Sequence, residues 1–150
     1  MDSIDHKILM ELQRNAKQNT KEIAAKVGLS VTPTYERIKK MEQKGVIQKY
    51  VAQVDKNQVN KKLTAFCQIT LSMHQKVLID QFKNDILLHP EVMECHHVSG
   101  KFDFLLKILV QDIESFHYFV NEKLSDIEGI ATIQSSFVMN VVKETQVIEL

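Results

Sequence analysis

The sequence predicts an α+β protein, in which a helical N-terminal part precedes a part that alternates strands and helices. Three observations predict this class. Residues 3–44 repeat apolar side chains at helical spacing, residues 64–73 alternate apolar and polar side chains as a strand does, and a polar stretch at 55–62 separates the two patterns. The chain has 150 residues and 44% of them are hydrophobic, so it can bury a core and is not expected to be disordered.

Charge and composition narrow the function classes. Residues 1–56 carry eleven Lys/Arg and seven Asp/Glu, whereas residues 57–150 carry eight and twelve, which favours two modules with different partners. The two cysteines offer no disulfide framework and fit a reducing compartment. The apolar run FLLKILV is short and broken by Lys107, and MDSIDHKILMELQ is unlike a signal peptide. We therefore expect a cytoplasmic protein without a membrane partner.

Two helices are predicted at the start of the chain. Residues 3–16 place apolar side chains on one face of the first helix. Asn19 and Glu22 stand three residues apart, as the members of a capping box do, and predict the start of the second. Gly28 follows where helices commonly end in a left-handed residue. The turn from Gly28 to Ser30 is short, so the next helix must cross the second at a steep angle.

Pro33 predicts where the third helix begins, because proline lacks a backbone N–H and is harmless only in the first turn. Ser30 and Thr32 are both suitable N-caps, and Gly45 ends the helix after about Lys44. The predicted apolar stripe consists of Tyr35, Ile38 and Met41, with Thr34 nearby. The residues predicted to point away from this stripe are Thr32, Pro33, Glu36, Arg37, Lys40, Gln43 and Lys44.

The outward face of this helix has the chemistry of a helix-turn-helix DNA-binding element. Small hydroxyl side chains at its start allow close approach to base edges in the major groove. Arginine can bond guanine through two hydrogen bonds, and lysine neutralises phosphates. An ordinary solvated surface is the alternative. The candidate DNA-binding residues are Ser30, Thr32, Pro33, Glu36, Arg37, Lys39, Lys40 and Lys44. The alternating stretch VIQKYVAQV that follows predicts a strand-like wing or a connector.

The C-terminal part predicts the order strand, helix, strand, strand, helix, strand. The first strand has Ala65, Cys67, Ile69, Leu71 and Met73 on one face. The helices carry core-spaced apolar residues at Val77, Leu78, Phe82 and Ile86, and at Ile113, Phe116, Val120, Leu124 and Ile127. The other strands are VMECHHV, FDFLLKILV after the turn SGK, and the stretch after Gly129, with QVIEL as a candidate edge strand. This order is the ferredoxin-like βαββαβ fold, an antiparallel sheet with two helices on one face.

The predicted domains are a winged-helix-like helix-turn-helix domain at residues 1–54, a linker at 55–62, and a ferredoxin-like domain at 63–150. The second face of the sheet would lie open in a monomer. Phe66 and Leu109 on that face indicate that another subunit covers it.

The run NAKQNTKEIAAKVGLSVTPTYERIKKMEQKGVI resembles the DNA-binding region of the Lrp/AsnC family, the leucine-responsive and asparagine regulators. DSIDHKIL, GVIQKYVAQVD and VSGKFDFLLKILV followed by DIESF resemble the same family, so the resemblance covers essentially the whole chain. It implies a transcriptional regulator with an N-terminal helix-turn-helix and a C-terminal ferredoxin-like domain that dimerises and often binds an amino acid. It also implies that dimers assemble further, to an octamer in our expectation.

In the family pattern the third helix opens with Ser-Pro-Thr-Pro and continues with adjacent basic residues. The matching residues here are Ser30, Thr32, Pro33 and Arg37, with Lys39 and Lys40 as the basic pair. Val31 replaces a frequent proline, and Glu36 replaces a frequent basic residue. Glu36 can accept a hydrogen bond from cytosine N4 or pair with Lys40 one turn on, and we favour the pairing.

The resemblance places an effector site at the turn after the second strand, where the family shows Gly-x-x-Asp. Gly100 and Asp103 fit this pattern. Glycine lets a ligand reach backbone N–H groups that hold a carboxylate, and Asp103 can meet an α-ammonium group. A plain hairpin is the alternative. The last strand of a neighbouring subunit usually adds Thr-x-Thr, which reads Ile133 and Ser135 here, so one hydroxyl is lost and loss of the effector response is a further alternative.

Three other functions compete with this one. The candidate metal ligands are Cys67, His74, His89, Cys95, His96 and His97, but no CxxC or HxxxH pair supplies the spacing of a zinc site. No nucleophile, base and orienting group can be identified together, so we expect neither an enzyme nor a cofactor. The strongest alternative is a protein that senses an amino acid or forms oligomers without binding DNA. Duplex binding that weakens steeply with salt discriminates against it.

Overall fold

The computed structural model describes residues 1–73 and 75–150, which form two compact units. Unit 1 comprises Met1–Gln53 and Lys143–Leu150, and unit 2 comprises Val54–Val142. The chain therefore passes between the units twice. The predicted C-terminal domain had included the last stretch, residues 143–150, which belongs to unit 1 in the structure.

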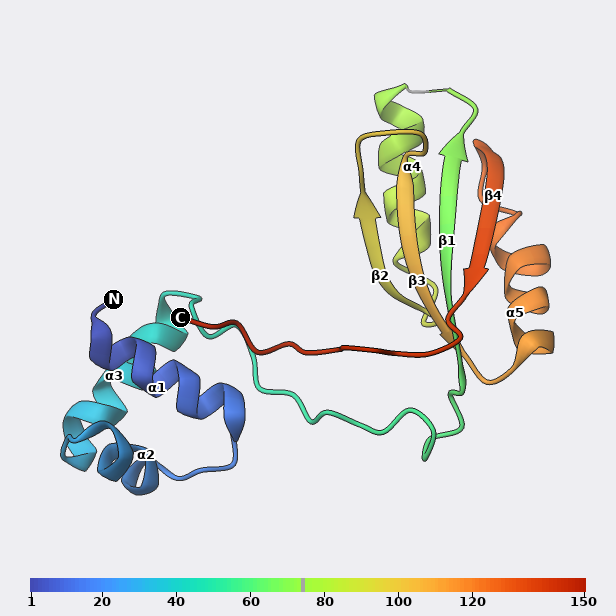
Figure 1. The fold of residues 1–150 in the computed structure, drawn as a ribbon. Helices are drawn as coiled ribbons and strands as arrows, with labels where there is room; N and C mark the ends of the chain where they lie inside the picture. The colour runs from blue at the N-terminus through green and yellow to red at the C-terminus, as the bar shows by residue number, and fades with distance from the viewer. Residues whose placement is uncertain (74) are drawn as a thin grey trace. The chain divides into compact units, whose positions relative to one another are not determined.

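Unit 1 contains three helices, α1 (Ser3–Arg14), α2 (Thr20–Val27) and α3 (Val31–Gln43), in the predicted order (Figure 1). Apolar side chains from all three helices meet in one small core. Its buried members are Ile8, Leu9, Ile23, Val27, Ile38 and Met41. The helix-turn-helix arrangement that the sequence predicts is thus present.

Local hydrogen bonds define the ends of these helices. The side chains of Asp2 and Asp5 form a capping box at the start of α1, and Asn19 and Glu22 form another at the start of α2. Gly28 ends α2 in the left-handed conformation with φ of 75°. Both the second capping box and this glycine were predicted from the sequence, because each signal lies within a few residues of its effect.

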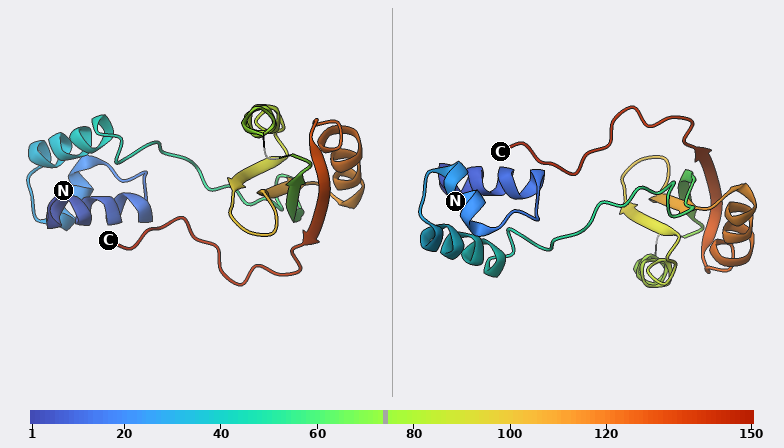
Figure 2. Two further views of the ribbon diagram at one scale, coloured as in Figure 1. Left: turned by 90° about the horizontal axis from the view of Figure 1, so that it is seen from above. Right: turned by 90° about the horizontal axis from the view of Figure 1, so that it is seen from below.

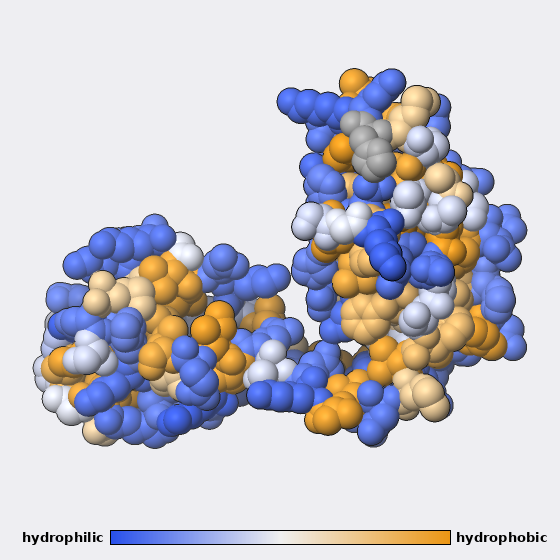
Figure 3. All heavy atoms as spheres, turned by 45° about the horizontal axis from the view of Figure 1, so that its top comes forward, coloured by the Kyte–Doolittle hydropathy of each residue, from blue (hydrophilic) through white to orange (hydrophobic). Residues whose placement is uncertain are grey.

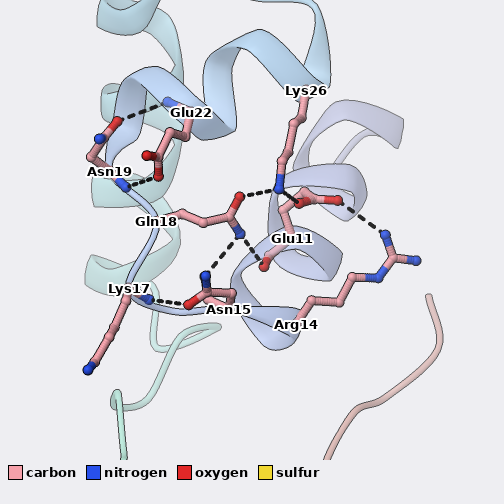
Figure 4. A network of polar contacts seen from close by, with 8 residues as sticks. All are labelled: Glu11, Arg14, Asn15, Lys17, Gln18, Asn19, Glu22 and Lys26. Atoms are coloured by element: carbon pink, nitrogen blue, oxygen red, sulfur yellow. Dashed lines mark hydrogen bonds and ion pairs between the residues drawn. The ribbon is translucent and has the colours of Figure 1, made fainter.

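A polar network fixes the turn between α1 and α2 (Figure 4). The Gln18 side-chain amide donates to the carbonyl oxygens of Glu11 and Asn15, at 2.9 and 3.0 Å. Lys26 of α2 donates to the Glu11 carboxylate at 2.7 Å and also bonds Gln18. Gln18 therefore satisfies the Glu11 carbonyl of the last turn and the C-cap carbonyl of Asn15, and Lys26 ties the two helices together ahead of the turn into α3.

The segment after α3 is a connector, the second of the two predicted alternatives. The backbone N–H groups of Val46 and Ile47 both donate to the carbonyl oxygen of Met41 and close the helix. Residues 46–54, all of which the structure describes, form no strand. An alternating pattern makes a strand only where a partner strand accepts its hydrogen bonds.

The stretch at residues 143–150, here called the tail, also forms no strand, so the candidate edge strand QVIEL is absent. The tail instead contacts α1 within unit 1. The Gln13 amide donates to the carbonyl oxygen of Ile148 at 3.0 Å and accepts from its N–H at 2.7 Å. Leu150 lines a hollow of about 420 Å³ beside Met10. A side-chain amide can bond the N–H and C=O groups of one residue as a neighbouring strand would. The apolar–polar alternation of the sequence does not show which of the two partners is used.

Unit 2 is a four-stranded antiparallel sheet covered by helices (Figures 1 and 2). Its elements are β1 (Leu63–Leu71), α4 (Lys76–Ile86), β2 (Val92–His97), β3 (Phe104–Val110), α5 (Ile113–Phe119), a short π-helix η1 (Val120–Leu124) and β4 (Ile130–Phe137). The strand order is β2-β3-β1-β4. This confirms the predicted ferredoxin-like βαββαβ topology.

The core of unit 2 lies between the sheet and the helices. Ala65, Cys67, Ile69 and Leu71 of β1 are buried there, as predicted. The Phe82 and Phe104 rings pack with centroids 4.4 Å apart.

For some residues of the unit 2 helices, the predicted burial in the core was wrong. Val77 is 73% exposed and Ile113 is 39% exposed, whereas Phe119 is fully buried and was not predicted. Phe119 stands three residues after the buried Phe116, on the same side of α5, whereas the predicted stripe took Val120, four residues on.

The other face of the sheet carries no helix. Phe66 is exposed on it, and Lys107 donates to Glu94 at 3.1 Å beside it. Hydrophobic and hydrophilic residues are mixed over the side of unit 2 seen in Figure 3.

Candidate DNA-binding helix and effector turn

Helix α3 buries one narrow face and leaves two rows of side chains exposed. Thr34, Ile38 and Met41 are buried at i, i+4 and i+7. Thr34 tolerates burial because its hydroxyl donates to the Ser30 carbonyl oxygen at 2.9 Å. Tyr35, predicted to be in the core, is 50% exposed. That prediction was wrong because the face centred on Thr34 leaves Tyr35 about 100° away around the helix.

Of the two predicted N-cap residues, Ser30 holds the N-cap position, and Val31 is the first helical residue. The Ser30 side chain makes no capping hydrogen bond, so its hydroxyl is not used in closing the helix. Pro33 still lies in the first turn, where its missing N–H leaves no partner unsatisfied. Thr32 is exposed next to it.

Arg37 does not extend freely from α3. Its Nη1 atom donates to Asp2 Oδ2 at 2.8 Å and to Asp5 Oδ1 at 2.6 Å, and its side chain is 32% exposed. The guanidinium therefore fastens α3 to the capping box of α1. Sequence reasoning had given Arg37 to guanine, and it missed this contact because Asp2 and Asp5 lie more than thirty residues away in the chain.

Lys39 belongs to a chain of contacts along the edge of α3. Its Nζ donates to Glu42 at 2.7 Å and lies 5.8 Å from the Tyr35 ring centroid. Glu42 also accepts from the Tyr50 hydroxyl at 3.0 Å. Partial burial, together with the neighbouring Glu42 carboxylate, raises the pKa of Tyr50 to about 12. The charge of Lys39 is thus shared with a carboxylate.

The side of α3 that faces away from the core exposes Glu36 and Lys40, and Lys44 is exposed just after the helix. The predicted pair of Glu36 with Lys40 does not form, and neither lysine has a carboxylate within ion-pair distance in the part of the chain that the structure describes. Two extended side chains on a helix surface gain little from pairing, so solvation wins there. These two lysines, Lys40 in α3 and Lys44 at its C-cap, remain available to a phosphate.

The contact of Arg37 with Asp2 and Asp5 predicts a response to acid. Hydrogen bonds from the Asp5 backbone N–H and from Arg37 lower the pKa of Asp2. Desolvation opposes the same change at Asp5, but bonds from the Asp2 N–H and Arg37 outweigh it, so the pKa of Asp5 is also lowered. A carboxyl whose pKa is lower in the folded protein stabilises the fold above its unfolded pKa of about 3.9, and this contribution disappears as pH falls through the folded value.

We therefore expect α1 of the wild type to lose protection against hydrogen exchange as pH falls below about 4. Asp5→Asn should show a smaller loss over the same range, because one of the two titrating groups is gone. Hydrogen exchange of α1 amides, corrected for intrinsic rates, measures this. Asp126→Asn, at an exposed position of unit 2, is the control. Identical pH dependence in Asp5→Asn and wild type would contradict the assignment.

Gly100 and Asp103 lie in the connection between β2 and β3. Gly100 is exposed with φ of 142°, and nothing lies within 4 Å of where a Cβ would be. Asp103 Oδ2 accepts from the Leu71 N–H at 2.7 Å, and its own N–H donates to the Ile69 carbonyl at 2.8 Å. Asp103 thus joins this turn to the end of β1. The alternative of a plain hairpin with a solvent-facing aspartate did not predict this contact.

Ile133 and Ser135 face the helix-covered side of the sheet. They pair with Ile69 and Cys67, and Ser135 Oγ lies 3.3 Å from Cys67 Sγ. Ile69 lies between β3 and β4, so in one chain a whole strand separates these two residues from the Gly100 turn. One subunit does not bring the four predicted effector residues together.

A hollow that sequence reasoning missed lies on the open face of the sheet. It has a volume of about 510 Å³ and is lined by Gln68, Thr70, Lys101, Phe102, Thr132 and Gln134. The sequence signal was present, because Thr132 and Gln134 alternate with Ile133 and Ser135 along β4 and must point the other way. The two residues of β4 that the resemblance assigns to the effector, Ile133 and Ser135, lie on the opposite face.

Metal ligation and membrane-spanning helices can be checked over the residues described. Among them no three His, Cys, Asp or Glu side chains are placed to hold a metal ion together. His74, one of the residues considered, lies outside them. Burial raises the pKa of both Cys67 and Cys95, which does not favour thiolate chemistry. None of the helices at residues 1–73 and 75–150 is both long and apolar enough to cross a bilayer.

Comparison with known proteins gives matches to both units. Residues 1–48 match a winged helix-turn-helix DNA-binding model, and residues 64–148 match an Lrp/AsnC ligand binding domain model. The leucine-responsive regulatory protein of Escherichia coli (strain K12) is 35% identical over 145 residues, which cover 97% of this chain and 88% of that protein.

Two solved structures are similar over nearly the whole chain. An AsnC family transcriptional regulator from Agrobacterium tumefaciens has a TM-score of 0.94 and 38% identity, with 99% of this chain and 96% of that one covered. A transcriptional regulator from Neisseria meningitidis, solved as a complex with L-Met, has a TM-score of 0.93 and 32% identity, with 97% and 94% covered.

Proposed function

The chain belongs to the Lrp/AsnC family and is an effector-modulated, DNA-binding transcriptional regulator; from this premise we propose that α3 enters the major groove of its operator and that the effector is an amino acid. The proposed entry of α3 into the major groove rests on one observation, the exposed row of Thr32, Glu36 and Lys40 on this helix. The helix has a free hydroxyl-bearing start and a basic outer edge, as groove recognition requires.

Within this proposal the predicted DNA-binding residues take different tasks. Ser30 and Thr32 approach base edges or phosphates at the start of the helix, and Pro33 shapes its first turn. Lys40 and Lys44 neutralise phosphates, because neither is held by a carboxylate in the described part of the chain. Arg37 and Lys39 orient the helix and its edge through the ion pairs with Asp2, Asp5 and Glu42.

Replacing Lys40 with alanine tests the phosphate contact. We expect operator binding to weaken, and the slope of log K against log salt to become shallower by about 0.9, the value for one lost phosphate contact. Lys76→Ala, at an exposed lysine of α4, should leave both affinity and slope unchanged. Fluorescence anisotropy with a duplex over a salt series measures both. An unchanged slope in Lys40→Ala would remove this residue from the phosphate contacts.

For the effector we propose a site between subunits. The Gly100 turn and Asp103 of one subunit hold the carboxylate and ammonium groups, and Ile133 and Ser135 come from a neighbour. Support comes from the exposed glycine at the turn and from the separation of the two halves within one chain. The Neisseria meningitidis relative, solved with L-Met, makes an amino acid the natural ligand class.

A thermal-shift screen of the twenty amino acids identifies the effector. A ligand at a hundred times its dissociation constant stabilises the folded state by about 2.7 kcal/mol, a readily measured shift. We expect one or a few amino acids to raise the melting temperature, and the rise to follow concentration. If none of the twenty does so at millimolar concentration, the proposal of an amino-acid effector is wrong and the DNA-binding assignment is untouched.

Regulation follows from assembly in this proposal. The open sheet faces of two chains pair to form a homodimer, which assembles further, to an octamer. Pairing sets two α3 helices at a fixed distance, which suits half-sites about one helical turn (about 10.5 base pairs) apart, or a multiple of that spacing. The amino acid shifts the balance between assembly states only in so far as it binds one of them more tightly.

A further inference from the structure

Helix α3 exposes two apolar side chains that its core does not explain. Val31 and Tyr35 stand one turn apart, 45% and 50% exposed, in the half of the helix nearest its start. Neither belongs to the core cluster of unit 1. Single exposed apolar residues are common on surfaces, but this pair lies on the element that the proposed function brings to the base edges.

The Tyr35 ring is supported on one side. Lys39 lies one turn further on with its Nζ 5.8 Å from the ring centroid, and Lys39 is itself held by Glu42 at 2.7 Å. Glu42 in turn accepts from the Tyr50 hydroxyl at 3.0 Å. This series of contacts restricts the Tyr35 ring before DNA binds, so a contact between the ring and DNA costs little conformational entropy. The helix therefore offers an apolar row, Val31 and Tyr35, beside the polar row of Thr32, Glu36 and Lys40.

The major groove contains one apolar group on its base edges, the C5-methyl group of thymine. Guanine is most often read by arginine, but the only arginine of α3, Arg37, is engaged by Asp2 and Asp5. The groups that remain free at the start of the helix are thus apolar and hydroxyl side chains. We propose that Val31 and Tyr35 are specificity-determining residues that contact thymine methyl groups in each half-site.

This inference rests on the proposed entry of α3 into the major groove, and its test separates the two. The full-length protein first selects its preferred duplex from a random library. Each thymine of the selected half-site is then replaced, one at a time, by deoxyuridine, which lacks only the methyl group. For the wild type we expect one or two positions at which this change weakens binding by about fourfold, the value of one buried methyl group.

Variants assign the effect to the side chains. Tyr35→Ala and Val31→Ala should bind the selected thymine duplex more weakly and should no longer distinguish it from the deoxyuridine duplex at the matching position. Tyr35→Phe keeps the ring and should keep the discrimination. Lys76→Ala, in unit 2, should behave as wild type. Both target residues are exposed, and circular dichroism checks that each variant is folded.

Four results are decisive. If the wild type binds a selected duplex tightly and no deoxyuridine weakens it, methyl readout is overturned while DNA binding stands. If discrimination exists but survives in folded Tyr35→Ala and Val31→Ala, these residues are not its source. If no duplex is bound even at low salt, the proposed function itself fails. Discrimination that disappears with the side chains and persists in Tyr35→Phe supports the inference.

Discussion

Replacing Arg37 with alanine is expected to weaken operator binding by about tenfold while leaving the slope of its salt dependence unchanged. The structure places the guanidinium on Asp2 and Asp5 of α1, at 2.8 and 2.6 Å, and not in open solvent. Its removal leaves two carboxylates facing α3 without a counter-charge and loosens the helix that has to meet the groove. A lost phosphate contact would instead make the slope shallower by about 0.9.

The partner residue distinguishes an orienting role from direct reading. If Arg37 orients α3, Asp5→Asn should weaken operator binding in the same direction as Arg37→Ala. If DNA draws Arg37 away from the carboxylates, Asp5→Asn should tighten binding, because the competitor is gone. Arg14→Ala is the matched control, since Arg14 is an exposed arginine of α1 paired with Glu11 at 3.1 Å. Tighter binding by Asp5→Asn would falsify the orienting role.

Replacing Asp103 with alanine is expected to abolish the amino-acid response and also to lower the stability of unit 2. The carboxylate accepts from the Leu71 N–H at 2.7 Å, and Leu71 is buried. An N–H left without an acceptor in such a place lowers the free energy of unfolding by about 1–3 kcal/mol. Urea unfolding and a ligand titration by calorimetry measure the two effects separately.

Asp103→Asn separates the structural role of this residue from its proposed role in binding. The asparagine side-chain oxygen can still accept from Leu71, so stability should be largely retained. The negative charge that pairs with an α-ammonium group is lost, so the amino acid should bind far more weakly or not at all. Operator binding without effector should be retained by Asp103→Asn. If Asp103→Asn titrates with the amino acid as wild type does, Asp103 is not the ammonium partner.

Local sequence signals were enough to predict the elements and their order. The capping box at Asn19 and Glu22, the left-handed Gly28 and the alternation along β1 all act within a few residues. The order of these elements then leaves few topologies open. The family resemblance added the pairing of a helix-turn-helix with a ligand-binding domain, which the two family matches confirm.

The site was harder to predict because its contacts are long-range. The sequence shows that Arg37 points away from the core stripe, but not that Asp2 and Asp5 are there to receive it. Tyr35 could be placed only after burial showed that Thr34 is part of the core. Phe119 was missed because both i+3 and i+4 positions follow Phe116 on the inner side of α5, and the pattern does not say that packing buries the i+3 residue completely. Each error lies where packing partners, and not local preference, decide.

The tail contact makes unit 1 discontinuous in sequence, with the whole of unit 2 inserted between its two parts. When unit 2 is unfolded, docking residue 148 onto Gln13 must close a loop of roughly ninety residues, at an entropic cost on the order of 4 kcal/mol. A folded insertion restrains its own ends, so much of this entropy is already lost before the tail docks. A substitution that leaves a cavity at Phe104 should therefore also reduce the fraction of molecules whose tail is docked on α1. The chain connections thus couple the unfolding of unit 2 to the loss of the tail contact in unit 1.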